Sequence, residues 1–136
     1  MRTPALLLAL ASLVAAPVVM PTAAQAPSSA SADIQLQLGD LFAAEGRIGD
    51  AADAYQRALA AAAADVALAR RARAGLTLML LRTGDFGGAR ALAEQLTHGD
   101  GSDAAAQSLY GDTLWAFGLF DEAGHAYETA IEADAP

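Results

Sequence analysis

Apolar residues recur at helical spacing from residue 32 onward, and the same register appears three times, over 38–59, 76–96 and 110–131. In each segment a helical stretch stops at a glycine, a large apolar residue follows two positions later, and an alanine follows three positions after that. These positions are Gly46, Gly84 and Gly118, then Ile48, Phe86 and Phe120, then Ala51, Ala89 and Ala123. Such repetition predicts an all-α solenoid in which helix pairs stack side by side. We expect six helices, at about 32–45, 49–64, 66–82, 86–97, 103–117 and 121–134.

The interval between the helix-ending glycines is 38 residues in the first case and 34 in the second. Four extra residues are close to one helical turn, so a longer helix near 59–68 would keep its buried face in phase. This stretch is rich in alanine, which favours a helix over a flexible insertion.

The repeated register resembles the tetratricopeptide repeat, a helix-turn-helix unit with the pattern W-x2-L-G-x2-Y, then A-x3-F and a final proline. The first copy matches it at Leu38, Gly39, Phe42, Ala51, Tyr55 and Ala58, and the third at Gly111, Leu114, Ala123, Tyr127 and Ala130. The middle copy departs from it at Thr77, Leu80 and Ala93, and Gln35, Arg73 and Gln107 replace the opening tryptophan. The resemblance implies about three repeats, at 32–65, 70–103 and 104–136, and a role in binding proteins.

Local chemistry adds detail to the helix boundaries and the core. The glycine at each helix end is expected to take the left-handed conformation that other residues resist. Ser102 and Asp103 are suited to cap the fifth helix. Four of the five aromatic residues of the third copy are expected in the core: Tyr110, Phe117, Phe120 and Tyr127.

The first twenty residues contain one arginine and then an apolar run, and small residues follow. This layout predicts a secretory signal peptide over 1–24, with cleavage after Ala24, or alternatively near Ala26 or Ala30. A flexible leader over 25–31 and a helical domain over 32–136 are then expected. An uncleaved anchor is the other interpretation, but the apolar run is shorter than the about 20 residues of a spanning helix. We therefore expect export and no stable membrane insertion.

Composition narrows the classes of partner. The net charge of −8 argues against nucleic acid, which is bound by a basic face. The absence of cysteine excludes disulfides, thiolate metal sites and a cysteine nucleophile. All eight basic residues are arginine, which together with the alanine bias is typical of a GC-rich bacterial coding sequence, so export would lead to the periplasm.

The chain shows no pattern of residues suited to catalysis. His98, Asp100 and Asp103 lack the ligand number and spacing of a calcium or zinc site, so a glycine-rich turn before a helix cap is the favoured interpretation. There is no phosphate-binding loop with a lysine and no serine nucleophile motif. We expect no catalytic residue, no cofactor and no metal ion.

In the family that the chain resembles, the first helices of the pairs line a concave groove in which peptides or helices dock. The residues of this chain predicted to form the partner-binding groove are Asp33, Leu36, Asp40, Arg71, Leu78, Leu81, Arg82, Ser108, Asp112 and Trp115.

Two features of this groove leave alternatives open. Arg71 and Arg82 either form a cationic spot for a partner's carboxylate or, as we favour, pair with neighbouring acids such as Asp40 and Asp112. Trp115 either lies in the groove as a binding residue or is buried against the last helix.

The sequence therefore predicts a non-catalytic exported adaptor that holds a peptide or helix of a partner protein. The alternative is a structural protein that self-associates, in which an uncapped acidic third repeat meets the arginine-rich face of another copy.

Overall fold

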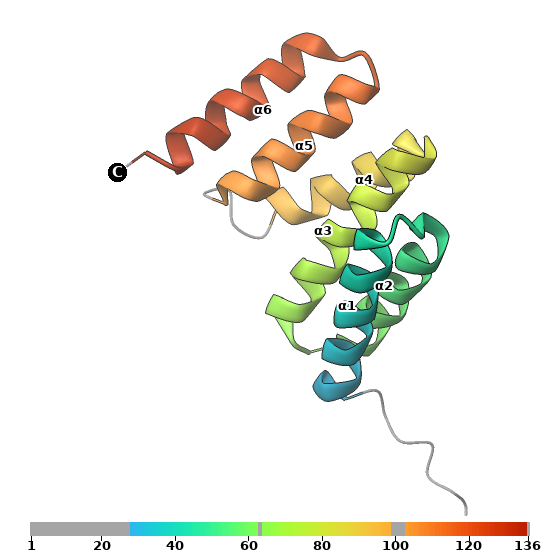
Figure 1. Cartoon of the computed structure of the whole chain (residues 1–136). Coiled ribbons are helices and arrows are strands. Elements are labelled where there is room, and N and C mark those ends of the chain that lie inside the picture. Colours follow the sequence, from blue (N-terminus) through green and yellow to red (C-terminus); the bar gives the residue numbers. More distant parts are fainter. Residues whose placement is uncertain (1–27, 63, 99–102, 136) are drawn as a thin grey trace, which may run out of the picture.

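The computed structural model describes residues 28–62, 64–98 and 103–135, and these form an array of six α-helices (Figure 1). The helices are α1 (Ser29–Ala44), α2 (Ile48–Ala62), α3 (Val66–Thr83), α4 (Phe86–Thr97), α5 (Ala104–Ala116) and α6 (Phe120–Ala133). The described residues include no strand. The all-α fold and the six predicted helices are confirmed, with ends that differ by at most three residues.

The largest of these differences is at the start of α1. The Ser28 side chain accepts a hydrogen bond from the Ser31 backbone N–H at 3.3 Å and caps the helix. Residues 29–31, expected in a flexible leader, are therefore helical. The predicted signal peptide and residues 25–27 lie outside the described residues.

Each helix-ending glycine has the left-handed conformation expected of it. The φ angles are 75° at Gly46, 82° at Gly84 and 81° at Gly118. At Gly84 the backbone N–H bonds back to carbonyls of the last turn of α3. The turn after the first helix of each pair is thus set by one residue.

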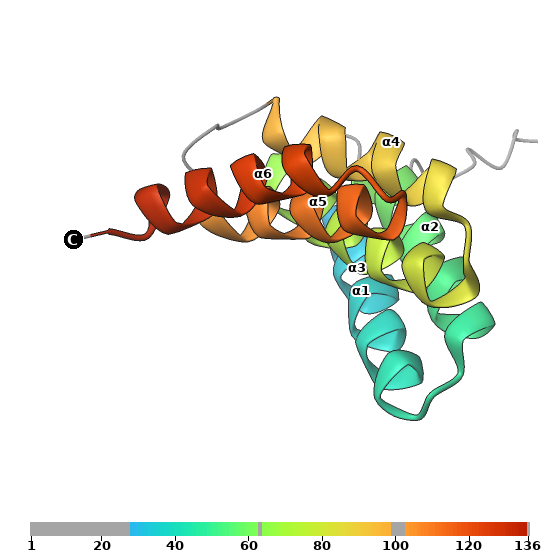
Figure 2. The same cartoon turned by 90° about the horizontal axis from the view of Figure 1, so that it is seen from above.

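The first helices of the pairs, α1, α3 and α5, are neighbours along one side of the array, because α3 contacts both α1 and α5. Each second helix packs against its own first helix, and α2 and α4 also pack against the first helix of the next pair. The two views show the α5–α6 pair turned away from the α1–α2 pair (Figures 1 and 2). This is the stacking of a helical repeat array.

The main core cluster joins the first two pairs around Tyr55, which is 4% exposed. Its ring lies against Gly39 of α1 and Gly75 of α3, since a Cβ added to either glycine would stand 2.6 Å from a ring carbon. In the middle repeat Thr77 takes the place of Gly39 and Ala93 that of Tyr55, and both are fully buried. A larger residue on one helix thus compensates for a smaller one on the other, which explains how a degenerate copy keeps its packing.

The expected core differs from the observed one in the third repeat. Phe117 and Phe120 are exposed, whereas Tyr110 and Tyr127 are half-buried and pack against the cluster around Leu114. The prediction of a core position was therefore wrong for the two phenylalanines. They lie at the turn between α5 and α6, where the Arg90 guanidinium of α4 lies 5.7 Å from the centre of the Phe117 ring, and α6 itself contacts no helix but α5 among the described residues.

Among the described residues, no helix is both long enough and apolar enough to cross a membrane.

Candidate partner-binding groove

A cavity of about 350 Å³ opens between α3 and α5, on the side of the array formed by the first helices. Its walls are lined by Ala67, Arg70, Arg71, Ala74, Leu96, Asp103, Ala105, Ala106 and Leu109. The alanines keep the two helices apolar but leave space between them, because their side chains are too short to meet. The result is an apolar floor with charged groups at its edge.

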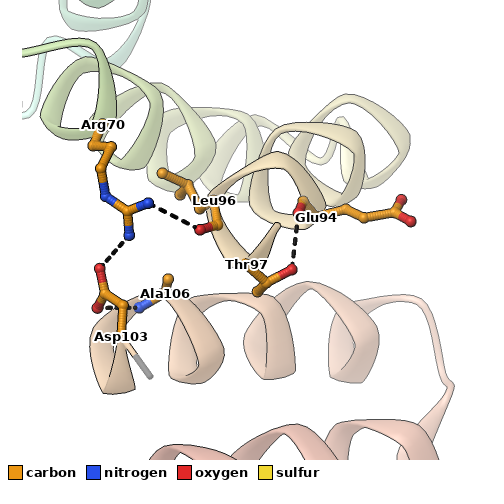
Figure 3. Close-up of polar contacts among 6 residues, drawn as sticks. All are labelled: Arg70, Glu94, Leu96, Thr97, Asp103 and Ala106. Atoms are coloured by element: carbon orange, nitrogen blue, oxygen red, sulfur yellow. Dashed lines mark hydrogen bonds and ion pairs between the residues drawn. The ribbon is translucent and has the colours of Figure 1, made fainter. Parts of the chain in front are cut away.

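Arg70 forms one edge of the groove and ties three helices together (Figure 3). Its guanidinium donates to the Leu96 carbonyl at 3.2 Å and forms an ion pair with the Asp103 carboxylate. Asp103 also caps α5, because it accepts the Ala106 backbone N–H at 3.0 Å. The Ala106 hydrogen bond and then the Arg70 guanidinium lower the pKa of Asp103.

Sequence reasoning identified Asp103 as a helix cap but missed Arg70 as its partner. Arg70 precedes Ala74 by four residues and therefore shares its helix face, which was the available signal. Which acid it would meet depended on how α3 and α5 stack, and that is a tertiary property.

Arg71 lies at the opposite edge and pairs with Asp40 of α1, with 3.5 Å between Nη2 and Oδ2. The Tyr55 hydroxyl donates to the same carboxylate at 2.8 Å. Burial of Tyr55, and then its bond to Asp40, raise the pKa of this hydroxyl. The favoured pairing of Arg71 with a neighbouring acid is thus present, although the Arg71 side chain remains largely exposed.

The other predicted groove residues lie as follows. Asp33 accepts a hydrogen bond from Gln37 at 2.7 Å, and Asp112 accepts one from the Tyr127 hydroxyl at 2.8 Å. Leu81 is half-buried against the cluster that contains Leu109. Leu78, Arg82 and Ser108 are exposed, as is Asp112. Within the described residues, Arg82 forms no ion pair.

Leu36 was placed wrongly. It is 1% exposed and belongs to the core cluster around Tyr55. Leu36 faces the next pair, where α3 covers it, so it is unavailable to a partner.

Trp115 lies at the surface and is not buried against the last helix. Its side chain is 59% exposed and packs edge-on against Phe120, with 4.8 Å between the ring centroids. Trp115 therefore contributes an exposed aromatic surface near the turn between α5 and α6.

The described residues include no group of three or more histidine, cysteine or acidic side chains that could hold a metal ion. On the exposed side of α6, 3.4 Å separate His125 Nδ1 from Glu128 Oε2. His98 is the C-terminal cap of α4. Asp100, the third member of the metal loop considered above, lies outside the described residues.

Comparison with known protein families gives a match over both halves of the array. The family model described as "Tetratricopeptide repeat" matches residues 36–100 and 78–136. A comparison with curated protein sequences gives no match. Because the two matched segments together span most of the chain, the chain belongs to the tetratricopeptide repeat family, whose repeats generally mediate interactions between proteins.

Proposed function

We propose that the chain is an exported, non-catalytic adaptor that holds a peptide or helix of a partner protein in the groove between α3 and α5. The observation that carries the proposal is the cavity of about 350 Å³ with an apolar floor and arginines at its edges. That volume is at the lower end of ordinary ligand pockets and suits one or two apolar side chains of a bound segment.

The charges at the two edges of the groove differ in what they offer a partner. Arg70 is occupied by the Leu96 carbonyl and the Asp103 carboxylate, so it acts as part of the wall. Arg71 is exposed, and its contact with Asp40 is long, so a partner's carboxylate or carbonyl can compete for it at low cost. We therefore expect a partner segment with apolar anchors and an acceptor group beside them.

Export is the second component of the proposal. Its support is the pattern of the first 24 residues, and the compartment proposed is the bacterial periplasm.

A photo-crosslinking amino acid at position 105 tests the groove in the intact cell. Ala105 is exposed and lines the cavity, and Glu94 on α4 is an exposed control position outside the cavity lining. We expect position 105 to give one crosslinked product of defined mass. Position 94 should give no product of that mass. Equal products from both positions would contradict the proposal.

The captured protein then allows a quantitative test by isothermal titration calorimetry. Arg71→Glu reverses the charge at the edge, so affinity should fall at least tenfold. Arg57→Glu makes the same change on α2, where Arg57 is exposed and bonds Gln35, and should leave affinity within about twofold of the original. Similar losses from both variants would indicate only a general charge effect.

A further inference from the structure

The surface with which α1 and α2 hold α3 occurs a second time in the chain, on α5 and α6. Most residues of the first pair that pack in the cluster with α3 have a similar residue 72 positions later, although Leu36 is replaced by Ser108. Asp40, Tyr55, Ile48 and Leu59 correspond in this way to Asp112, Tyr127, Phe120 and Ile131.

The first copy of this surface is covered and the second is open. Tyr55 is buried and Ile48 and Leu59 are half-buried, because they pack in the cluster that includes Ala72, Leu76 and Met79 of α3. On the second copy Phe120 is 56% exposed and Ile131 is 71% exposed. We call the surface formed by Trp115, Phe120, Tyr127 and Ile131 the α6 end face.

A shallow depression marks the place that a further helix would take. Its lining includes Ser108 of α5 and Ala130 and Ile131 of α6. Ser108 corresponds to Leu36, and Ile131 to Leu59, both of which pack in the cluster that contains α3 residues. None of the described residues fills this depression.

The tyrosine of each surface restricts what can lie on it. Tyr55 is touched by Gly39 from its own repeat and by Gly75 from the helix that covers it. Gly111 contacts the Tyr127 ring as Gly39 contacts the Tyr55 ring. A Cβ added to Gly111 would stand 2.5 Å from a carbon of the Tyr127 ring. A helix that covers Tyr127 at the same distance must therefore present a glycine there.

The charge of the α6 end face further defines the occupant. Asp40 accepts the Tyr55 hydroxyl and also meets Arg71, which precedes Gly75 by four residues on the covering helix. Asp112 accepts the Tyr127 hydroxyl at the same 2.8 Å, but within the described residues no arginine pairs with it. No lysine or arginine follows Arg90 in the sequence. The aspartates and glutamates of the α5–α6 pair therefore make this region negatively charged.

We propose that the α6 end face binds an amphipathic helix of a partner protein in the way that α1 and α2 bind α3. This partner helix carries an arginine or lysine and, four residues later, a glycine. This goes beyond the groove proposed above, because the occupant is different and lies mainly on α6, although the two hollows adjoin at Ala105, which lines both of them.

A second copy of the chain fits this surface less well. The helix it would offer is α1, on which Ile34 and Leu41 are exposed. However, α1 carries Gln37 at the position of Gly75, counted from the helix-ending glycines, and it contains acids but no basic residue. Both the required glycine and the required positive charge are missing from α1.

The chain itself supplies a probe for the experiment, which is a synthetic peptide of residues 65–84 with blocked ends. Trp115 is the only tryptophan among the 136 residues of the chain and the peptide has none, so Trp115 fluorescence of this chain reports binding. We expect a saturable blue shift. A peptide with Gly75→Leu should bind at least tenfold more weakly, although leucine favours a helix more than glycine does. A peptide with Arg71→Glu should bind at least fivefold more weakly.

Two protein variants locate the site. Ile131→Glu on the α6 end face should weaken peptide binding at least tenfold, whereas Ile34→Glu, the same change at an exposed isoleucine of α1, should have no effect. Three results would overturn the proposal: no binding of the peptide, equal binding of the Gly75→Leu peptide, or equal effects of the two variants. Self-association of the peptide-free protein that Ile34→Glu abolishes would also overturn it, because a second copy would then be the occupant.

Discussion

Tyr55 shows how one side chain sets the spacing of three helices. Its ring separates α1 from α3 while it projects from α2, and its hydroxyl is held by Asp40. The helices come this close because Gly39 and Gly75 offer no Cβ to the ring. At these positions glycine is required for close approach, even though it weakens a helix interior.

Substitution of Gly39 by alanine tests this requirement. The added Cβ would stand 2.6 Å from the Tyr55 ring, which is buried and cannot move aside, so we expect a loss of about 1–3 kcal/mol in the free energy of unfolding. Gly124→Ala in α6 is the matched control, because a Cβ there meets no atom within 4 Å. It should stabilise the protein by up to about 1 kcal/mol through helix propensity alone. Urea unfolding of both variants gives the comparison, and stabilisation by Gly39→Ala would contradict the role assigned to Tyr55.

The stability of the first turn of α5 depends on the ion pair between Arg70 and Asp103. Since the pKa of Asp103 is lowered in the folded state, its carboxylate adds stability that is present above the unfolded pKa of about 3.9 and is lost as the pH falls through the folded value. Asp103→Asn keeps the capping acceptor but removes the charge. We expect it to cost about 1 kcal/mol of unfolding free energy at pH 7, and less at pH 2, because protonation of Asp103 removes the charge as the pH falls.

The control for this prediction is Asp65→Asn. Asp65 caps α3 through the Leu68 N–H at 3.1 Å, and no arginine within the described residues bonds to it. Chemical unfolding followed at both pH values should therefore show a smaller change for this variant at pH 7. An equal change would mean that the charge at the cap, and not the Arg70 pair, is responsible.

Most of the element-scale structure could be predicted from the sequence, because glycine at helix ends and alanine at helix crossings are local signals. Errors arose where exposure depends on how pairs stack. Leu36 looked like a groove residue from its position on the helix, but the next pair covers it. Phe117 and Phe120 looked like core residues because their side chains are large and apolar, but they remain about half exposed, and only Arg90 of the preceding pair lies against Phe117 within the described residues. Arg70 was missed because its partner lies 33 residues away.

At the scale of the whole molecule, the helices differ in how many neighbours support them. Tetratricopeptide arrays are stabilised mainly by contacts between adjacent elements, so local opening is easiest where such contacts are fewest. Within the described residues, α6 contacts α5 alone, whereas α3 contacts α1, α2, α4 and α5.

Hydrogen exchange should follow this difference. We expect the backbone amides of α6 to exchange fastest among the six helices and those of α3 to exchange slowest, because opening α6 disturbs one interface and opening α3 disturbs four. Mass spectrometry of peptic fragments would resolve the helices. If a basic helix covers the α6 end face, the 65–84 peptide should slow exchange in α6 without changing it in α1, and the Gly75→Leu peptide should do neither. Protection of α6 equal to that of α3 in the isolated protein would contradict the prediction, because it would require a further contact on the face that carries Tyr127 and Ile131.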